Sequence, residues 1–149
     1  MKTILLEGTE LSGKTTLAES VRQRLTNDGY YIFVNSGSID KSSRLVNVPL
    51  NMAQRFGSPT FKELMYTFSL IADRNPKKIY NGFDFFMQER YFPSVIAYSR
   101  VLNPLGINRI IGKILQKTYS SFDINILVKA GIEARLERIK SRERKTKLD

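Results

Sequence analysis

The sequence predicts an α/β fold in which helices cover both faces of a parallel β-sheet. Two observations carry this prediction. Short apolar runs alternate with segments of helical periodicity, and a glycine-rich loop separates the first apolar run from the first helical segment. The expected order, β-α-β-α-β-α-α-β-α, needs the crossover connections that are typical of parallel strands. A length of 149 residues suits one domain, so residues 1–149 are expected to form a single unit.

The N-terminal part of the chain predicts two strands around one helix. The apolar run 3–7 ends at a glycine and reads as a buried strand. Apolar residues then recur at helical spacing over 17–25, and an Asn-Asp-Gly stop at 27–29 ends that helix. Aromatic and β-branched residues at 30–34 indicate the second strand.

The middle of the chain is less regular. Residues 35–58 are rich in Ser, Asn and Gly, so at best short helical fragments are expected there. Pro59 begins an amphipathic helix, and the Asn75-Pro76 pair ends it, because a residue before proline disfavours the helical region. Residues 83–88 predict the third strand, with Glu89 at its carboxyl end.

Three helices and one strand are expected in the rest of the chain. Pro93 begins a helix to about residue 102, and isoleucines and a leucine form another over 107–115. Residues 123–128 predict the fourth strand, and the apolar spacing over 132–139 predicts the last helix.

Composition excludes several kinds of chemistry. The chain has no histidine and no cysteine, so it can form no disulfide, thiolate nucleophile, Cys/His zinc site or histidine base. Carboxylates, Lys, Arg, hydroxyl groups and a hard ion such as Mg²⁺ remain. The formal net charge of +10 favours polyanions or phosphorylated small molecules. No apolar run approaches the roughly 20 residues of a membrane span or forms a signal-peptide core, so a soluble cytoplasmic protein is expected.

One motif identifies the phosphate-binding element. Residues 8–15 match G-x-x-x-x-G-K-[ST] at every fixed position, between the first strand and the first helix. Glycines let the backbone N–H groups approach a phosphate, and the helix N-terminus adds partial positive charge. In such a P-loop the lysine reaches the β- and γ-phosphates of ATP and the following hydroxyl holds Mg²⁺. The predicted binding residues are Gly8, Thr9, Glu10, Leu11, Ser12, Gly13, Lys14, Thr15 and Thr16. The alternative is a glycine-rich turn before an ordinary helix.

Further motifs in the same order resemble those of thymidylate kinases, which are P-loop nucleoside-monophosphate kinases. Residues 88–98, Gln-Glu-Arg-Tyr-Phe-Pro-Ser-Val-Ile-Ala-Tyr, resemble the family's D-R-Y-x-x-S-x-x-A-Y element, with Glu89 in place of Asp. Residues 70–74 are similar to its F-A-A-D-R helix end, and residues 7–10 to its E-G-x-[DE]. Residues 123–142 resemble the strand and helix that lead into the family's lid. Where the family has an R-E-P-G segment, residues 35–38 read Asn-Ser-Gly-Ser.

The resemblance implies a kinase that uses ATP and Mg²⁺ to phosphorylate a small nucleotide acceptor, a pyrimidine deoxynucleoside monophosphate such as dTMP. A deoxynucleoside kinase and a degenerate, non-catalytic ATP-binding module are the alternatives. A homodimer packed through the Pro59 and Pro93 helices is implied as well. A membrane partner is not expected, and nucleic-acid binding is disfavoured because no recognition motif accompanies the charge.

The resemblance and the residue chemistry together assign roles outside the loop. Glu89 is placed to orient Mg²⁺ or its waters, and Arg90 to bind phosphate oxygens in bidentate fashion; an ordinary ion pair between them is the alternative. By resemblance, Glu10, Arg74 and Tyr98 contact the acceptor. Their alternatives are a solvated loop carboxylate, a cation at a helix C-terminus and plain packing, respectively.

The C-terminal segment resembles the beginning of a lid. Six basic residues lie within 138–147, against the single acid Glu143. Some thymidylate kinases supply a catalytic arginine from the lid, and this phosphate loop has none, so Arg142 and Arg144 are the candidates. A solvated basic helix end is the alternative. A lid-like segment from about residue 140 is expected to be cut short, with the family's final strand and helix missing.

Overall fold

A computed structural model describes residues 1–55, 58–73, 79–94, 96–97 and 122–146. Residues 92–94 and 96–97 are also helical. The named helices and strands are β1 (Lys2–Glu7), α1 (Lys14–Asn27), β2 (Ile32–Ser36), α2 (Arg44–Arg55), α3 (Pro59–Ala72), β3 (Phe85–Glu89), β4 (Ile124–Leu127) and α7 (Ile132–Thr146).

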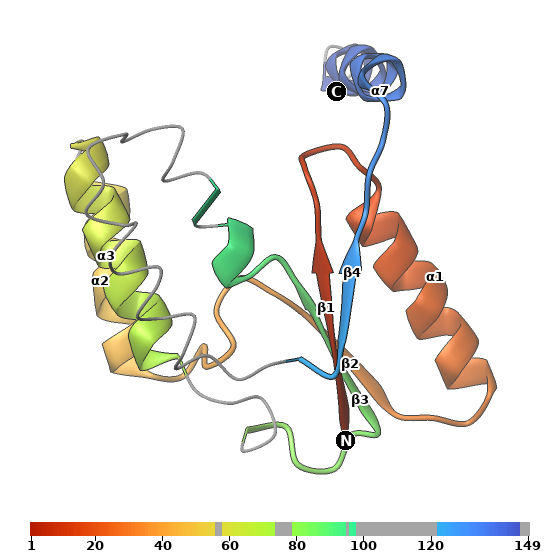
Figure 1. Cartoon of the computed structure of the whole chain (residues 1–149), viewed down its shortest axis with the longest axis horizontal. Helices are drawn as coiled ribbons and strands as arrows, with labels where there is room; N and C mark the ends of the chain where they lie inside the picture. The colour runs from red at the N-terminus through yellow and green to blue at the C-terminus, as the bar shows by residue number, and fades with distance from the viewer. Residues whose placement is uncertain (56–57, 74–78, 95, 98–121, 147–149) are drawn as a thin grey trace.

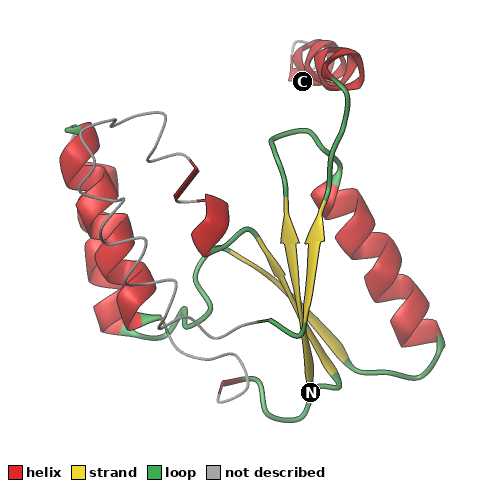
Figure 2. Cartoon of the chain, viewed as in Figure 1, coloured by secondary structure: helices red, strands yellow, loops and turns green. Residues whose placement is uncertain are grey.

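The four strands form one parallel sheet in the order β2-β3-β1-β4. Figure 1 shows α1 on one side of this sheet and α2 with α3 on the other, while α7 lies beyond the carboxyl ends of the strands. Figure 2 shows the same layers by element type. The predicted α/β class, with a parallel sheet between helices, is therefore confirmed.

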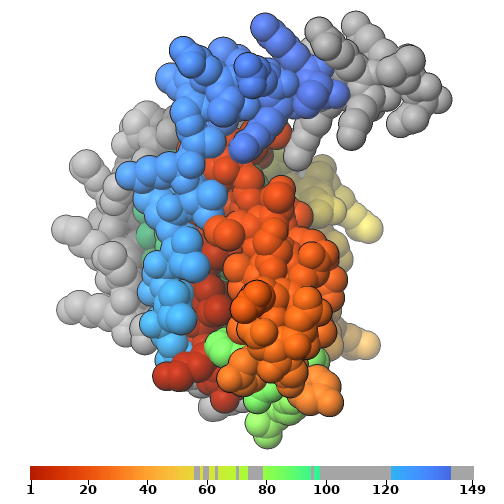
Figure 3. Space-filling view, turned by 90° about the vertical axis from the view of Figure 1, so that its right-hand side faces the viewer, coloured from red at the N-terminus to blue at the C-terminus, as the bar shows by residue number. Residues whose placement is uncertain are grey.

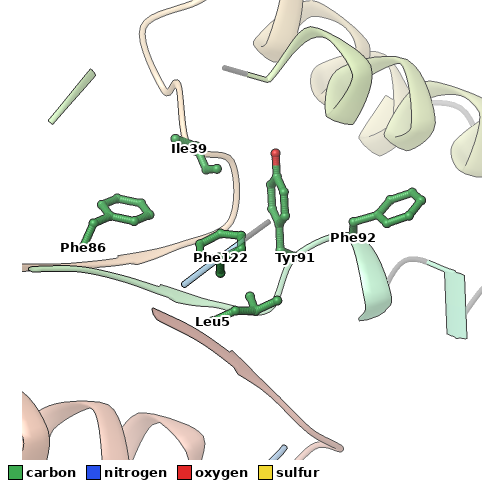
Figure 4. Close-up of a cluster of buried hydrophobic side chains, with 6 residues drawn as sticks. All are labelled: Leu5, Ile39, Phe86, Tyr91, Phe92 and Phe122. Carbon is green, nitrogen blue, oxygen red and sulfur yellow. The ribbon is translucent and has the colours of Figure 1, made fainter. Parts of the chain in front are cut away.

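Alternate residues of β1 supply the cores on the two faces of the sheet, as the period of two in a strand requires. Ile4 and Leu6 pack with Ala18 and Met87 on the side of α1. Leu5 belongs to the second cluster, which Figure 4 shows. That cluster consists of Leu5, Ile39, Phe86, Tyr91, Phe92 and Phe122. Burial on both faces explains why the strand reads as a continuous apolar run.

A side-chain bridge fixes β4 beside β1. The buried Thr3 donates its backbone N–H and its hydroxyl to Asp123 Oδ2, at 2.7 and 2.8 Å, and its hydroxyl accepts the Asp123 N–H at 3.0 Å. Paired residues run from Ile4 opposite Ile124 to Glu7 opposite Leu127. The bridge thus sets the register that brings the end of β4 to the phosphate loop.

The expectation of at most short helical fragments over 35–58 is wrong, because α2 spans twelve residues there. Asp40 accepts the backbone N–H groups of Ser42 and Ser43 just before the helix. The buried Val46 and Ala53 lie seven residues apart on one face. Pro49 lies inside α2 and lacks one helical donor. Packing of α2 against α3 outweighs that local cost, as tertiary contacts commonly do.

The other predicted elements fall close to their expected places. The second and third strands begin at Ile32 and Phe85, two residues later than predicted. Only the first part of the helix expected from Pro93 is described, and the helix expected over 107–115 lies outside the described residues.

The homodimer remains a prediction. Among the described helices, none has the length and apolar character needed to cross a membrane.

Tyr80 anchors the loop that follows β2, and this contact predicts a pH-dependent stability. Its hydroxyl donates to the Ile39 carbonyl at 2.9 Å, and its ring stacks on Phe33. Burial, helped by the charges of Asp40 and Asp73, raises the pKa of Tyr80. The folded protein therefore favours the neutral phenol. Its stabilisation is fully present below the ordinary tyrosine pKa of about 10 and is lost as the pH rises through the higher folded pKa.

We expect Tyr80→Phe to lower the free energy of unfolding by about 1 kcal/mol at neutral pH, the usual worth of one such hydrogen bond. The difference between the two proteins should shrink above about pH 10, because the phenolate cannot donate. Urea unfolding at both pH values measures it. A difference that does not change with pH would contradict this assignment.

Candidate active site

The loop from Gly8 to Gly13 joins the end of β1 to the start of α1, as predicted. Gly8, Leu11 and Gly13 have positive φ angles of 150°, 60° and 99°. The Gly13 carbonyl accepts the Leu17 N–H at 2.9 Å, so Gly13 caps α1. The unpaired N–H groups of the first helical turn give this end a partial positive charge that suits an anion.

Lys14 is buried at the base of this loop, with 6% of its surface exposed. Its ammonium donates to the carbonyl oxygens of Gly8 and Thr9, at 2.8 and 2.6 Å, and to Ser12 Oγ at 3.4 Å. These contacts hold the amine beneath the loop rather than in solvent. A phosphate would offer this ammonium a negatively charged acceptor, which adds a charge–charge attraction that a neutral carbonyl lacks.

The charges around Lys14 are mixed. Burial lowers its pKa, and the positive charge of Arg90 acts in the same direction. The carboxylates of Glu7, Glu89 and Glu10 oppose that shift. A bound phosphate would add negative charge and favour the protonated amine, because opposite charges stabilise the charged form.

Glu89 meets the loop at the carboxyl end of β3. It lies opposite Leu6 of β1 and Ser36 of β2 in the sheet. The Thr15 hydroxyl donates to Glu89 Oε2 at 2.9 Å. Magnesium is usually held by one or two carboxylates, with waters and substrate phosphates filling its other positions. The hydroxyl and carboxylate pair fits that ion. Among the described residues, no group of three or more acidic side chains could hold a metal by itself.

Arg90 follows β3 in an unusual conformation. Its φ is 58°, a region that costs a non-glycine residue about 1–3 kcal/mol and is often found at functional sites. Its guanidinium Nη1 lies 3.6 Å from Glu10 Oε1, and both side chains are partly exposed. Such a pair contributes only about 0–1 kcal/mol to stability. Arg90 therefore pairs with Glu10, and Glu89 binds the Thr15 hydroxyl. This arrangement differs from the alternative of an ordinary ion pair between Glu89 and Arg90.

These groups line one cleft of about 1100 Å³. Residues 10–17 form one wall, and Glu89 with Arg90 another. Ser36 and Gly37, after β2, border the cleft as well, and Arg138 with Ser141 reach it from α7. Ligand pockets commonly measure about 300–1,000 Å³, so the cleft is as large as the upper end of that range.

Helix α7 is attached to the phosphate loop through two arginines. Arg135 Nε donates to the Glu10 carbonyl at 3.1 Å, and Arg138 Nη1 donates to the Leu11 carbonyl. Figure 3 shows α7, in blue, lying across the end of the molecule above β1 and α1. The helix thus brings positive charge to the edge of the cleft.

Comparison with known proteins agrees with the motifs. The sequence is 27% identical to a thymidylate kinase of Bacillus licheniformis in an alignment 134 residues long, and this alignment covers 82% of this chain and 63% of that protein. The fold matches the thymidylate kinase structure of Candida albicans with a TM-score of 0.60 at 19% identity, over 90% of this chain and 65% of the other. The chain is thymidylate kinase-like. It spans less than two thirds of the length of both relatives, and no family model matches it.

Most of the predicted site of this thymidylate kinase-like chain lies within one cleft. The loop residues from Glu10 to Thr16 line it together with Glu89 and Arg90. Arg74 and Tyr98, predicted to contact the acceptor, lie outside the described residues. Arg142 and Arg144 lie on α7, but only their backbone is described. Their role as lid arginines stays a prediction.

Two features of the cleft, and one residue next to the loop, have no predicted role. Arg138 belongs to the basic run, yet it lies one turn before the candidate Arg142. Ser36 and Gly37 occupy the place where the family has R-E-P-G, and that position was the available signal. The residue next to the loop is Glu7, the first residue of the E-G-x-[DE] motif. Its carboxylate accepts hydrogen bonds from the segment after Arg90.

Proposed function

We propose that this protein is a nucleoside-monophosphate kinase of the thymidylate kinase type, which transfers the γ-phosphate of ATP to a pyrimidine deoxynucleoside monophosphate. One observation carries the proposal: Lys14, the Thr15–Glu89 pair and Arg90 border one cleft at the carboxyl ends of parallel strands. The thymidylate kinase likeness of sequence and fold supports it. Ligands of open α/β sheets bind at that end of the strands.

The donor side of the proposed reaction uses the loop. Backbone N–H groups and Lys14 bind the ATP phosphates, and Thr15 with Glu89 would hold Mg²⁺, which neutralises charge on the β- and γ-phosphates when bound. In the transfer, an oxygen of the acceptor phosphate forms a bond to the γ-phosphorus. The bond between that phosphorus and the β,γ-bridging oxygen breaks, and ADP leaves.

The acceptor side uses Arg90 and Glu10. Arg90 lines the same cleft as the loop, so its guanidinium binds oxygens of the ATP γ-phosphate as well as of the acceptor phosphate, and the Glu10 carboxylate lies 3.6 Å from its Nη1. By resemblance, Arg74 and Tyr98 complete the acceptor site. Phosphoryl transfer depends on positioning and charge neutralisation more than on proton transfer, so a chain without histidine is suited to it.

A coupled ADP-release assay tests this proposal. We expect Mg²⁺-dependent ADP release with dTMP or dUMP, and no release above the acceptor-free rate with thymidine or deoxycytidine. Lys14→Ala serves as the inactive control. Turnover only with the nucleosides would instead identify a deoxynucleoside kinase. ATP binding without turnover on any of the four acceptors would identify a non-catalytic module and overturn the proposal.

A further inference from the structure

The backbone of Arg90 is held from several directions. Its N–H donates to the Leu6 carbonyl at 2.9 Å, and its own carbonyl accepts Gln88 Nε2 at 2.9 Å. Gln88 is fully buried, and its Nε2 also donates to the Gly37 carbonyl at 2.8 Å. The φ of Arg90 is positive, and a positive φ at a non-glycine residue persists only where the surroundings enforce it. The contacts with Leu6 and Gln88 hold the backbone of Arg90 itself in this turn.

Glu7 holds the residues that follow Arg90 in that turn. Its Oε1 accepts the Tyr91 N–H at 2.8 Å, and its Oε2 accepts the Ser94 hydroxyl at 2.5 Å. Tyr91 is the residue after Arg90, and Ser94 lies in the short helical segment that follows. A carboxylate at this place also complements the N–H groups of a helix start.

The position of Glu7 in the chain gives these contacts a consequence for the cleft. Glu7 is the last residue of β1 and directly precedes Gly8, the first residue of the phosphate loop. Its carboxylate therefore connects the loop to the segment that carries Arg90. A displacement of the phosphate loop would displace the segment that carries Arg90.

We propose that Glu7 is a positioning residue that fixes the turn at Arg90 and so directs the guanidinium toward a phosphate bound in the loop. The inference rests on the proposed function in one respect, namely that Arg90 binds a phosphate. Glu7 itself is not assigned a contact with either substrate. The competing explanation is a purely structural cap, which would affect the whole fold and not Arg90 in particular.

A double-mutant cycle separates the two explanations. The proteins are the unmodified chain, Glu7→Ala, Arg90→Ala and the double variant, each titrated with Mg-ATP by calorimetry. We expect each single variant to weaken binding about tenfold, which is about 1.4 kcal/mol. The double variant should bind less than about threefold more weakly than Arg90→Ala alone, because Glu7 acts through Arg90. Glu7→Gln keeps an acceptor for the Tyr91 N–H and should recover most of the affinity.

Two results would overturn this role for Glu7. Independent losses that multiply to about 100-fold in the double variant would show that Glu7 does not act through Arg90. An unchanged affinity in Glu7→Ala would exclude any positioning effect. Affinities are corrected for the folded fraction of each variant. Ser94→Ala is a milder variant, because it removes the Glu7–Ser94 contact and retains the Glu7–Tyr91 contact.

A readout without nucleotide keeps this test separate from the proposed function. Amide hydrogen exchange at Tyr91 should be at least about tenfold faster in Glu7→Ala than in the unmodified protein, and close to normal in Glu7→Gln. Unchanged exchange would overturn the positioning role. Failure of the unmodified protein to bind Mg-ATP would overturn the proposed function, while the exchange data would still decide whether Glu7 fixes the turn.

Discussion

Lys14→Ala is expected to weaken Mg-ATP binding at least about 100-fold, or about 2.7 kcal/mol. The ammonium lies beneath the loop with three acceptors, Gly8 O, Thr9 O and Ser12 Oγ, within 3.4 Å. A phosphate bound in the loop would receive the same donor as a charge-assisted hydrogen bond. Calorimetric titration with Mg-ATP measures the loss, and no acceptor is needed.

Lys2→Ala is the matched control for this substitution. It removes the same charge, but Lys2 is exposed at the opposite end of β1, where the strand begins. A general electrostatic attraction of ATP to a chain of net charge +10 would respond equally to both changes. A specific site responds only to Lys14→Ala. Equal losses in the two variants would contradict the assignment of Lys14 to the phosphates.

The strands of this fold could be predicted because their signal is local. A strand of a two-sided parallel sheet is typically a short apolar run, and such runs appear near all four strands, including β4, whose four residues are exposed at the sheet edge. Helix α2 could not be predicted in this way. Its sequence contains Pro49 and two valines, which are weak helix formers, and its stability comes from packing against α3. That contact has no signature within the segment itself.

The same distinction applies to the cleft. Residues 8–16 are contiguous, so a motif was sufficient to find them. The approach of Glu89 to Thr15 followed from a rule about the ends of parallel strands, although 74 residues separate them. The contact of Arg138 with the loop spans 127 residues and depends on where α7 begins after β4. No periodicity or charge count distinguishes Arg138 from the other basic residues of that helix.

Gly8→Ala is expected to produce the largest loss of stability, about 3 kcal/mol or more in the free energy of unfolding. A Cβ added at Gly8 would lie 2.3 Å from the Val128 carbonyl oxygen and 3.0 Å from Ser12 Oγ. Val128 cannot easily move away, because its N–H donates to the Glu7 carbonyl at 2.8 Å. Overpacking typically costs about 1–3 kcal/mol, and the φ of 150° adds backbone strain of about 1–3 kcal/mol for any residue with a side chain.

Gly29→Ala separates the two parts of this cost, because Gly29 also has a positive φ, of 87°, but a Cβ there would meet nothing within 4 Å. Urea unfolding of that variant should show only the backbone cost of about 1–2 kcal/mol. The excess in Gly8→Ala then measures the collision with the carbonyl after β4. If both variants lost the same stability, the close approach of that strand end to the phosphate loop would be wrong. The placement of α7 over the cleft would then also be wrong, since β4 leads directly into that helix.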